Sequence, residues 1–470
     1  MALSSALFSG ISGLGTLGNA MQIIGDNISN VNTVGFKSSQ FTFQDLLSQS
    51  VATQSGTSQI GRGTAIGDIY ASFEQGSFET TGSNTDLAIG GEGFFVLREA
   101  GSESLSYTRA GNFRLDKDGY LTNPEGYIVQ GWELDANADD VGSVTDVCLS
   151  SFTSPPQESQ EVEIIVNLDS DGGDNSAGAD DSLSSTWDGT NSTPLGETSY
   201  EYQTTLKVYD SLGSTHDITL YFDKADTGSA YEFIITCNAG EDKRTGASGN
   251  QWAGLLGRGL IHFNSGSGVI NDIDMWQINP ATGASVAQTE AGDLTEGFFT
   301  FESDFISGSP MNIALDFGSH YDGTSWMNNS LSTTQFARSS TTTFQSSDGY
   351  GAGDLQDINV DVDGVVTGTY SNGQVLPLYR VALAKFQNNL GLYKEGGNLY
   401  KETRTSGAAT TSSPGTNGLG SLAPNSLEQS NVDIANEFVR MITTQRGFQA
   451  NSKIITVTDQ MLADLINLKR

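Results

Sequence analysis

Residues 25–37 read GDNISNVNTVGFK, and they follow a run with a helical pattern of apolar residues. Glycine and asparagine supply the left-handed and side-chain-bonded turn conformations that stop a helix. The stretch therefore predicts an abrupt end to the first helix and a change in chain direction. Phe36 gives the segment that follows an apolar anchor. We interpret the stretch as a joint between two layers of structure, not as a binding or catalytic loop.

Before this joint, apolar residues recur every seven positions in two columns, which is the pattern of a coiled-coil helix. Several glycines interrupt the run, and each weakens an isolated helix by roughly 1 kcal/mol. We therefore expect this helix to need closely packed partners. The apolar residues that we expect to form its contacts are Leu3, Leu7, Leu14, Leu17, Met21, Ile24 and Ile28.

The last 45 residues repeat the seven-residue pattern over a length that suggests a coiled coil. One interpretation is a pair of amphipathic helices inside an ordinary globular core. The pattern favours the other, a coiled coil formed by both chain ends and buried mainly by copies of the same protein. On this helix the expected contact residues are Ile434, Phe438, Met441, Phe448, Ile455 and Leu462.

Between the two ends the sequence is β-like, with short β-rich runs separated by Gly and Asp-Gly turns. The predicted fold is mainly β with α-helical termini, in which β domains are nested between two helices that pair as a coiled coil. The expected divisions are a helical domain of 1–30 with 427–470, a connecting segment 31–70, an inner β domain of 71–145 with 336–402, an outer β insertion 146–335 and a linker 403–426.

The composition narrows the possible partners. The chain of 470 residues has a net charge of −34, which argues against nucleic acid and anionic membrane surfaces. Its richness in Gly, Ser, Thr and Asn is typical of extracellular β-rich proteins. We see no secretory signal peptide and no run long enough for a transmembrane helix. The surface composition and the missing export signal together suggest an export route without a cleaved peptide.

No catalytic constellation is visible, and we expect no enzyme activity, cofactor or metal site. His216, His262 and His320 form no metal-binding motif, and the acidic run at 168–181 fails the EF-hand spacing. Two cysteines, Cys148 and Cys237, are too few for a disulfide framework, and burial in strands is the simplest expectation for them.

The joint resembles the N-terminal signature of the bacterial flagellar rod and hook family. GEGFFVL (91–97), the run 107–131 and the helix 430–462 are similar to other segments of that family. The resemblance covers about 1–135 and 340–470. The residues that match the signature position by position are Asn27, Asn30, Asn32, Thr33, Gly35, Phe36 and Lys37.

The resemblance implies a structural protein. Because 146–335 is inserted into the inner β domain, the chain looks like the hook members of the family, which form a curved hollow tube that transmits torque from rod to filament. The implied location is the extracellular hook of the basal body. The implied partners are further copies of the chain, the distal rod protein, the hook cap protein, the hook-filament junction protein and the flagellar type III export apparatus.

Two alternatives remain from the sequence. The segment after Lys37 is somewhat longer than in the shortest hook proteins, and longer insertions there are a feature of rod proteins. A distal-rod or hook-associated protein therefore stays open. The more distant alternative is a secreted β-rich adhesin or carbohydrate-active enzyme, which would act as a monomer through a pocket in the middle domain.

Overall fold

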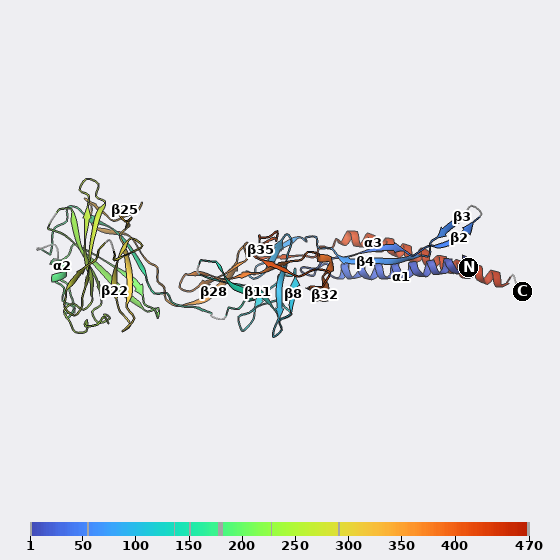
Figure 1. Ribbon diagram of the computed structural model, residues 1–470, viewed down its shortest axis with the longest axis horizontal. Coiled ribbons are helices and arrows are strands. Elements are labelled where there is room, and N and C mark those ends of the chain that lie inside the picture. The colour runs from blue at the N-terminus through green and yellow to red at the C-terminus, as the bar shows by residue number, and fades with distance from the viewer. Residues whose placement is uncertain are drawn as a thin grey trace. The chain divides into compact units, whose positions relative to one another are not determined.

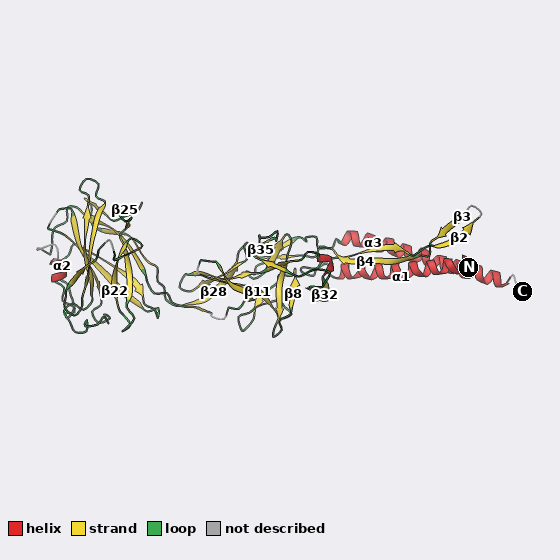
Figure 2. Ribbon diagram, in the orientation of Figure 1, coloured by secondary structure: helices red, strands yellow, loops and turns green. Residues whose placement is uncertain are grey.

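The computed structural model describes residues 2–53, 56–135, 137–149, 152–176, 182–226, 228–289 and 292–467. The chain divides into two compact units, Met1–Phe152 with Leu355–Arg470, and Thr153–Asp354. The second unit is thus an insertion in the first. Strands dominate both units, and the two long helices lie at the chain ends (Figure 2). The predicted class, mainly β with helical termini that pack together, is confirmed.

In the first unit, helix α1 (Ala2–Ser29) and helix α3 (Ile434–Asn467) run side by side (Figure 1). A two-stranded ribbon of β1 (Ser39–Asp45) and β4 (Thr64–Ala71) packs on α1, and the hairpin of β2 (Gln49–Thr53) and β3 (Gly56–Ile60) continues from it. We expected the segment 31–70 to be a simple connection. It instead contains β1, β2, β3 and all but the last residue of β4.

The inner β domain interleaves strands from both halves of the chain. Its main sheet has the order β28-β29-β30-β11-β7-β8-β33-β32, so strands before the insertion pair with strands after it. The strands are β5 (Phe78–Thr80), β6 (Leu87–Gly90), β7 (Phe94–Glu99), β8 (Leu105–Thr108), β9 (Arg114–Leu115), β10 (Leu121–Thr122), β11 (Tyr127–Leu134), β12 (Asp140–Asp146), β28 (Gly353–Val360), β29 (Val365–Tyr370), β30 (Val375–Val381), β31 (Leu383–Lys385), β32 (Tyr393–Gly396), β33 (Leu399–Lys401), β34 (Thr410–Ser412), β35 (Ser421–Pro424) and β36 (Ser426–Glu428). A short 3-10 helix, η1 (Asn389–Gly391), follows β31.

The prediction that 403–426 is a linker is wrong, because this segment belongs to the inner β domain. β34 pairs with β31 and β35 pairs with β6, and the side chains of Leu419 and Leu422 are buried in the core. A composition rich in Gly, Ser, Thr and Pro suits tight turns between short strands as well as it suits a linker. The predicted start of the last helix also moves, from residue 427 to Ile434, because 427–428 are part of β36.

The second unit packs two sheets face to face. One has the order β15-β16-β17-β18-β19-β20 and the other β21-β22-β23-β14-β26, with β27 also paired to β14. The elements are β13 (Thr153–Ser154), β14 (Glu161–Asp169), α2 (Ser182–Ser185), β15 (Tyr202–Tyr209), β16 (Thr215–Lys224), β17 (Ala230–Cys237), β18 (Leu255–Phe263), β19 (Ile270–Ile278), β20 (Ser285–Ala287), β21 (Leu294–Thr295), β22 (Phe298–Ser303), β23 (Met311–Asp316), β24 (Ser319–Tyr321), β25 (Trp326–Asn328), β26 (Thr334–Phe336) and β27 (Thr341–Ser347).

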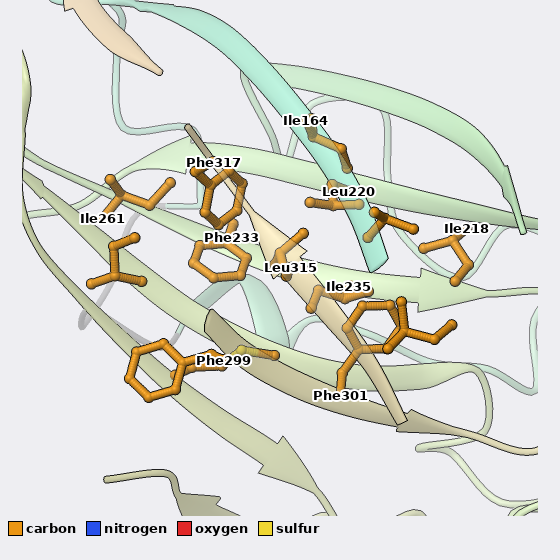
Figure 3. Close-up of a cluster of buried hydrophobic side chains, with 14 of the residues drawn as sticks. Ile164, Ile218, Leu220, Phe233, Ile235, Ile261, Phe299, Phe301, Leu315 and Phe317 are labelled. Carbon is orange, nitrogen blue, oxygen red and sulfur yellow. The ribbon is translucent and has the colours of Figure 1, made fainter. Parts of the chain in front are cut away.

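Side chains from both sheets fill the core of this unit. Phe233 and Ile235 of one sheet meet Phe301 and Leu315 of the other (Figure 3). The unit ends later than the expected residue 335, because β27 pairs along β14. Residues 336–354, which we had assigned to the inner domain, therefore lie in the insertion. Their alternation of Thr, Ser and Phe does not reveal which domain they join.

Three carboxylates on β14 and β23 make the stability of the second unit depend on pH. Glu163 lies opposite Asp316 in the register, and Glu161 is close by. Burial, followed by the charge of Asp316, raises the pKa of Glu161 and Glu163, and burial raises the pKa of Asp316. A raised pKa in the folded state means that folding is favoured by protonation, so stability is lost as the pH rises through these values.

We therefore expect the insertion to resist urea better at pH 5 than at pH 8. Urea denaturation of the full chain measures this difference when unfolding of the insertion is monitored by hydrogen exchange in β14 and β23. The double change Glu161→Gln with Glu163→Gln should flatten the profile, because the amides do not titrate. An equally steep profile in that variant would show that other groups cause it.

Candidate assembly site at the terminal helices

α1 and α3 pack as a close antiparallel pair, and glycines make the closeness possible. A Cβ atom added at Gly13 would lie 2.7 Å from Asn451 Nδ2, and one added at Gly10 would lie 3.1 Å from Ile455 Cγ1. One at Gly447 would lie 3.3 Å from Leu17 Cδ1. These contacts place residues whose numbers sum to about 464 opposite each other, which defines the register of the pair.

The centre of the helix pair contains small and polar side chains. Ala20 and Ile24 have no exposed surface. The other buried residues of the two helices are Gly10, Gly13, Thr16 and Asn27 on α1, and Glu437, Thr444 and Thr458 on α3. Of these, Thr16 and Asn27 hydrogen-bond the β1–β4 ribbon, at Thr64 and Ser39. The buried residues of the two helices therefore differ from the apolar columns that the sequence predicted.

The predicted contact residues fall into three groups. Ile24 is buried between the helices. Ile434, Phe438 and Phe448 are exposed, and the side chain of Leu3 lies outside the described residues. The others are partly exposed beside those buried residues: Leu7, Leu14, Leu17, Met21, Ile28, Met441, Ile455 and Leu462.

Helix α3 exposes a broad apolar surface that its partner α1 does not cover. We call it the outward apolar face. Its side chains are between 41% and 60% exposed, and exposed apolar side chains that are grouped in this way mark interaction sites. Its members are all exposed but are spread over more than half of the helix circumference: Ile434, Phe438, Val439, Ile442, Phe448, Ile454 and Met461. Sequence analysis missed four of these seven because they fall outside the seven-residue column. On α1, Phe8 and Ile11 are also exposed.

The joint after α1 is built by asparagine side chains. Asn27 Nδ2 donates to Ser39 O at 2.9 Å, and Asn27 Oδ1 accepts from Ser39 N at 2.8 Å, so the amide fastens the following strand to the helix end. Asn30 Nδ2 donates to Asp26 O, and Thr33 Oγ1 donates to Asn30 Oδ1. Asn32 is exposed. The helix therefore ends in a closed turn.

Gly35 has a backbone conformation and a position that exclude any side chain. Its φ is 67°, and a Cβ atom there would lie 2.5 Å from Ala110 N. Its N–H donates to Glu428 O at 2.7 Å. The joint thus presses directly against the inner β domain at this residue.

We expect Gly35→Ala to destabilise the first unit by roughly 2 kcal/mol or more, from positive-φ strain and the backbone clash together. Gly25→Ala is the matched control, because a Cβ there meets no atom within 4 Å and Gly25 is inside α1. That change should be neutral or stabilise by up to about 1 kcal/mol. Thermal unfolding of the two variants measures both effects, and equal melting temperatures would contradict the expectation.

Phe36 and Lys37 anchor the chain after the turn. The Phe36 ring is 3% exposed, with Lys394 Nζ 4.5 Å from its centroid. Lys37 is fully buried and its Nζ donates to Glu428 Oε1 at 2.6 Å and to Glu74 O at 2.8 Å. Burial lowers the pKa of Lys37, and the Glu428 carboxylate opposes that shift.

Glu428 is the centre of a buried charge cluster, which we define as Lys37, Glu428 and Arg109. Arg109 Nη1 lies 3.5 Å from Glu428 Oε2, and the guanidinium stacks over the Phe94 ring with 5.3 Å to its centroid. Gly76 N also donates to Glu428 Oε1. One carboxylate therefore holds two buried cations and connects three distant segments of the chain.

Asn431 adds a second set of bonds three residues later. Its Oδ1 accepts from Ser38 N at 2.8 Å, and its Nδ2 donates to Ser72 O and Glu74 O. The segment that leads into α3 is thus bonded to both strands of the β1–β4 ribbon at one end, just before β1 and just after β4. Sequence analysis missed Glu428, Arg109 and Asn431. Their partners are up to 393 residues away, and no local spacing marks them.

Other candidate chemistry remains without a site in the part of the chain that the structure describes. No three His, Cys, Asp or Glu side chains converge there as metal ligands. No described helix is long and apolar enough to cross a membrane. His216 lies between Asp210 and Glu241, with a hydrogen bond to each, and stacks on Phe305.

Four family models match the chain in order. They are the flagella basal body rod protein model at 7–37, the flagellar hook protein FlgE/F/G D1 domain at 88–167, the flagellar basal body protein FlaE D2 domain at 150–350 and the flagellar basal body rod FlgEFG protein C-terminal model at 423–468. The flagellar hook protein FlgE of Treponema pallidum is 32% identical over 99% of both chains. The chain belongs to the flagellar hook protein family. The resemblance seen in the sequence is thereby confirmed.

Further hook proteins match over the same length. FlgE of Borreliella burgdorferi is 34% identical over 99% of each chain, and FlgE of Escherichia coli K12 is 30% identical over the whole of both. The hook family is structural. Within it, the N-terminal model ends at Lys37 and the C-terminal model contains Glu428. The two partners of the buried Lys37–Glu428 ion pair therefore lie in the two terminal family segments.

Proposed function

We propose that this chain is a subunit of the flagellar hook that polymerises through its terminal helices. The outward apolar face of α3 carries the proposal, because seven large apolar side chains lie exposed on one helix. The occupant that we propose for this face is a second copy of the chain. Contacts between copies that do not close into a ring generate an open helical assembly.

Charge supports a second copy as the occupant. The insertion 153–354 has 29 acidic and six basic residues, so copies repel each other there. By contrast, α1 contains a single charged residue, Asp26, and α3 has three acidic and three basic residues. The helices are therefore the part of the chain where copies can approach most easily.

The assembly that we propose is a curved hollow tube with the terminal helices on its inner wall. It would join the rod to the filament and transmit torque, and the distal rod, hook cap and hook-filament junction proteins would contact its ends. We further propose that the chain leaves the cell through the flagellar type III export channel without a cleaved signal peptide. Residues 1–30 with 427–470, the inner β domain and the insertion would then be the assembly, middle and outer parts.

Negative-stain electron microscopy of the purified full chain tests this function. We expect curved tubes once the protein concentration exceeds a threshold. Straight tubes would instead support the distal-rod alternative. A chain that stays monomeric at every concentration and salt condition tested, with folded helices, would contradict the proposal.

A further inference from the structure

A column of polar residues spaced seven apart runs from residue 437 to residue 458, along the side of α3 that contacts α1 at Gly13. It consists of Glu437, Thr444, Asn451 and Thr458 and is called here the polar column. Glu437, Thr444 and Thr458 are 5%, 8% and 4% exposed. On α3 the polar column thus lies on the side toward α1, beside Ile455, whereas Phe438, Val439 and Ile442 stay exposed on the opposite side. An ordinary amphipathic helix would bury its apolar stripe instead.

Asn451 fits its place on α1 because residue 13 is glycine. A Cβ atom at Gly13 would lie 2.7 Å from Nδ2, 3.0 Å from Cγ and 3.2 Å from Oδ1 of Asn451. The side-chain amide therefore occupies the space that a side chain at residue 13 would need. An alanine at this point would require Asn451 to move.

Slipping the helices by seven residues would remove this fit. Because residues opposite each other sum to about 464, a slip of one heptad in either direction would place Asn451 opposite Ala6 or Ala20. Each has the methyl group for which the amide has no room in the observed packing.

Burial of apolar surface would favour a slipped or rotated pair of helices. The contact side of α1 has small residues, so α3 could bury more apolar area by turning its outward apolar face toward α1. Polar groups at buried helix positions cost stability but restrict helices to a single register. The polar column therefore acts against pairings that apolar contact alone would favour.

We propose that the polar column, with Asn451 resting on Gly13, determines the register of the α1–α3 pair and reserves the outward apolar face for a second copy of the chain. The inference rests on the proposed function for the role of that second copy. The assignment of register concerns a single chain and can be tested separately.

Disulfide formation between the helices measures the register. Leu17 and Gly447 are in contact, so the pair Leu17→Cys with Gly447→Cys reports the observed register. Leu17→Cys combined with Ile454→Cys, or with Arg440→Cys, reports a slip of one heptad in either direction. Peptide mapping after mild oxidation of the full chain distinguishes these bonds from any that involve Cys148 or Cys237.

The test variant removes polarity and keeps shape: Thr444→Val, Asn451→Leu and Thr458→Val together. We expect the 17–447 disulfide to fall at least about fivefold and the slipped disulfides to rise. The matched control, Thr443→Val with Thr456→Val, makes the same Thr→Val change at exposed positions of α3 and should leave the 17–447 disulfide unchanged.

A second variant tests the fit at Asn451 without changing α3. Gly13→Ala should lower the 17–447 disulfide, whereas Gly15→Ala should not, because a Cβ at Gly15 meets no atom within 4 Å. An unchanged 17–447 yield in the polarity variant would overturn the proposal. Loss of all three disulfides would overturn it too, because the column would then stabilise the pair without selecting its register.

The two proposals fail in different ways. If the chain that carries only Leu17→Cys and Gly447→Cys forms the disulfide but no tubes at any concentration, the proposed hook function is wrong. The disulfide yields still measure the register of the helix pair. If tubes form and the polarity variant keeps the disulfide pattern of that chain, only the register proposal fails.

Discussion

Replacing Glu428 by alanine is expected to destabilise the first unit by about 3–5 kcal/mol, because it leaves Lys37 and Arg109 as buried cations without a counter-charge. Lys37 and Glu428 have no exposed side-chain surface, and Arg109 is 3% exposed. The change also removes the acceptor of Gly76 N.

Hydrogen exchange measured by mass spectrometry on the full chain reports this loss unit by unit. Protection in 35–38, 72–76 and 426–431 should fall by about two to three orders of magnitude, at about 1.4 kcal/mol for each factor of ten. Protection in the core of the insertion should not change. Glu428→Gln keeps the shape of the side chain and should fall between alanine and the parent.

A matched control removes a partly exposed ion pair of the same unit. Glu395 Oε1 lies 2.7 Å from Lys401 Nζ, and both side chains are about a third exposed. We expect Glu395→Ala to cost less than about 1 kcal/mol. Equal effects of Glu395→Ala and Glu428→Ala would mean that burial of the charge cluster contributes nothing.

The second large effect concerns assembly. Phe438→Asp with Ile442→Asp places two charges one helical turn apart on the outward apolar face, where these side chains are 49% and 51% exposed. Burial of two such side chains against another copy is worth about 4 kcal/mol, so the threshold concentration for tubes should rise about a thousandfold or more. The folded chain should keep its stability, because neither side chain is buried within it.

The control adds the same charge elsewhere on α3. Asn436→Asp with Thr443→Asp alters exposed polar positions more than a quarter turn around the helix from Phe438 and Ile442, and we expect a much smaller change in the threshold. Sedimentation of polymer at increasing protein concentration measures the threshold for the parent chain, the double variant and the control. Normal tubes from the Phe438→Asp, Ile442→Asp variant would exclude this face as the contact between copies.

Local sequence patterns were sufficient for several parts of the fold. The turn after α1 follows from its asparagines and glycines, because these residues favour non-helical backbone wherever they occur. The β class follows from short β-rich runs between turns. Gly35 could be recognised within the family signature, although the contact with Ala110 that excludes a side chain there could not.

The candidate site was only partly predictable. A seven-residue repeat shows that a helix has a face but does not tell which neighbour covers that face. Ile434, Phe438 and Phe448 were therefore predicted as contact residues without any sign that α1 leaves them exposed. The polar column went unnoticed because Thr444, Asn451 and Thr458 look like surface residues until the glycines of α1 are placed opposite them.

By itself, the sequence of this chain determined the two helical ends, the β-rich middle and the joint at 25–37, because each depends on residues close together in the chain. Only the tertiary structure decided that Glu428 meets Lys37, that 403–426 adds strands to the inner domain and that α3 turns its apolar side outward. These features depend on contacts between segments far apart in the chain. The free energy that selects them comes from burial and pairing, which local spacing does not contain.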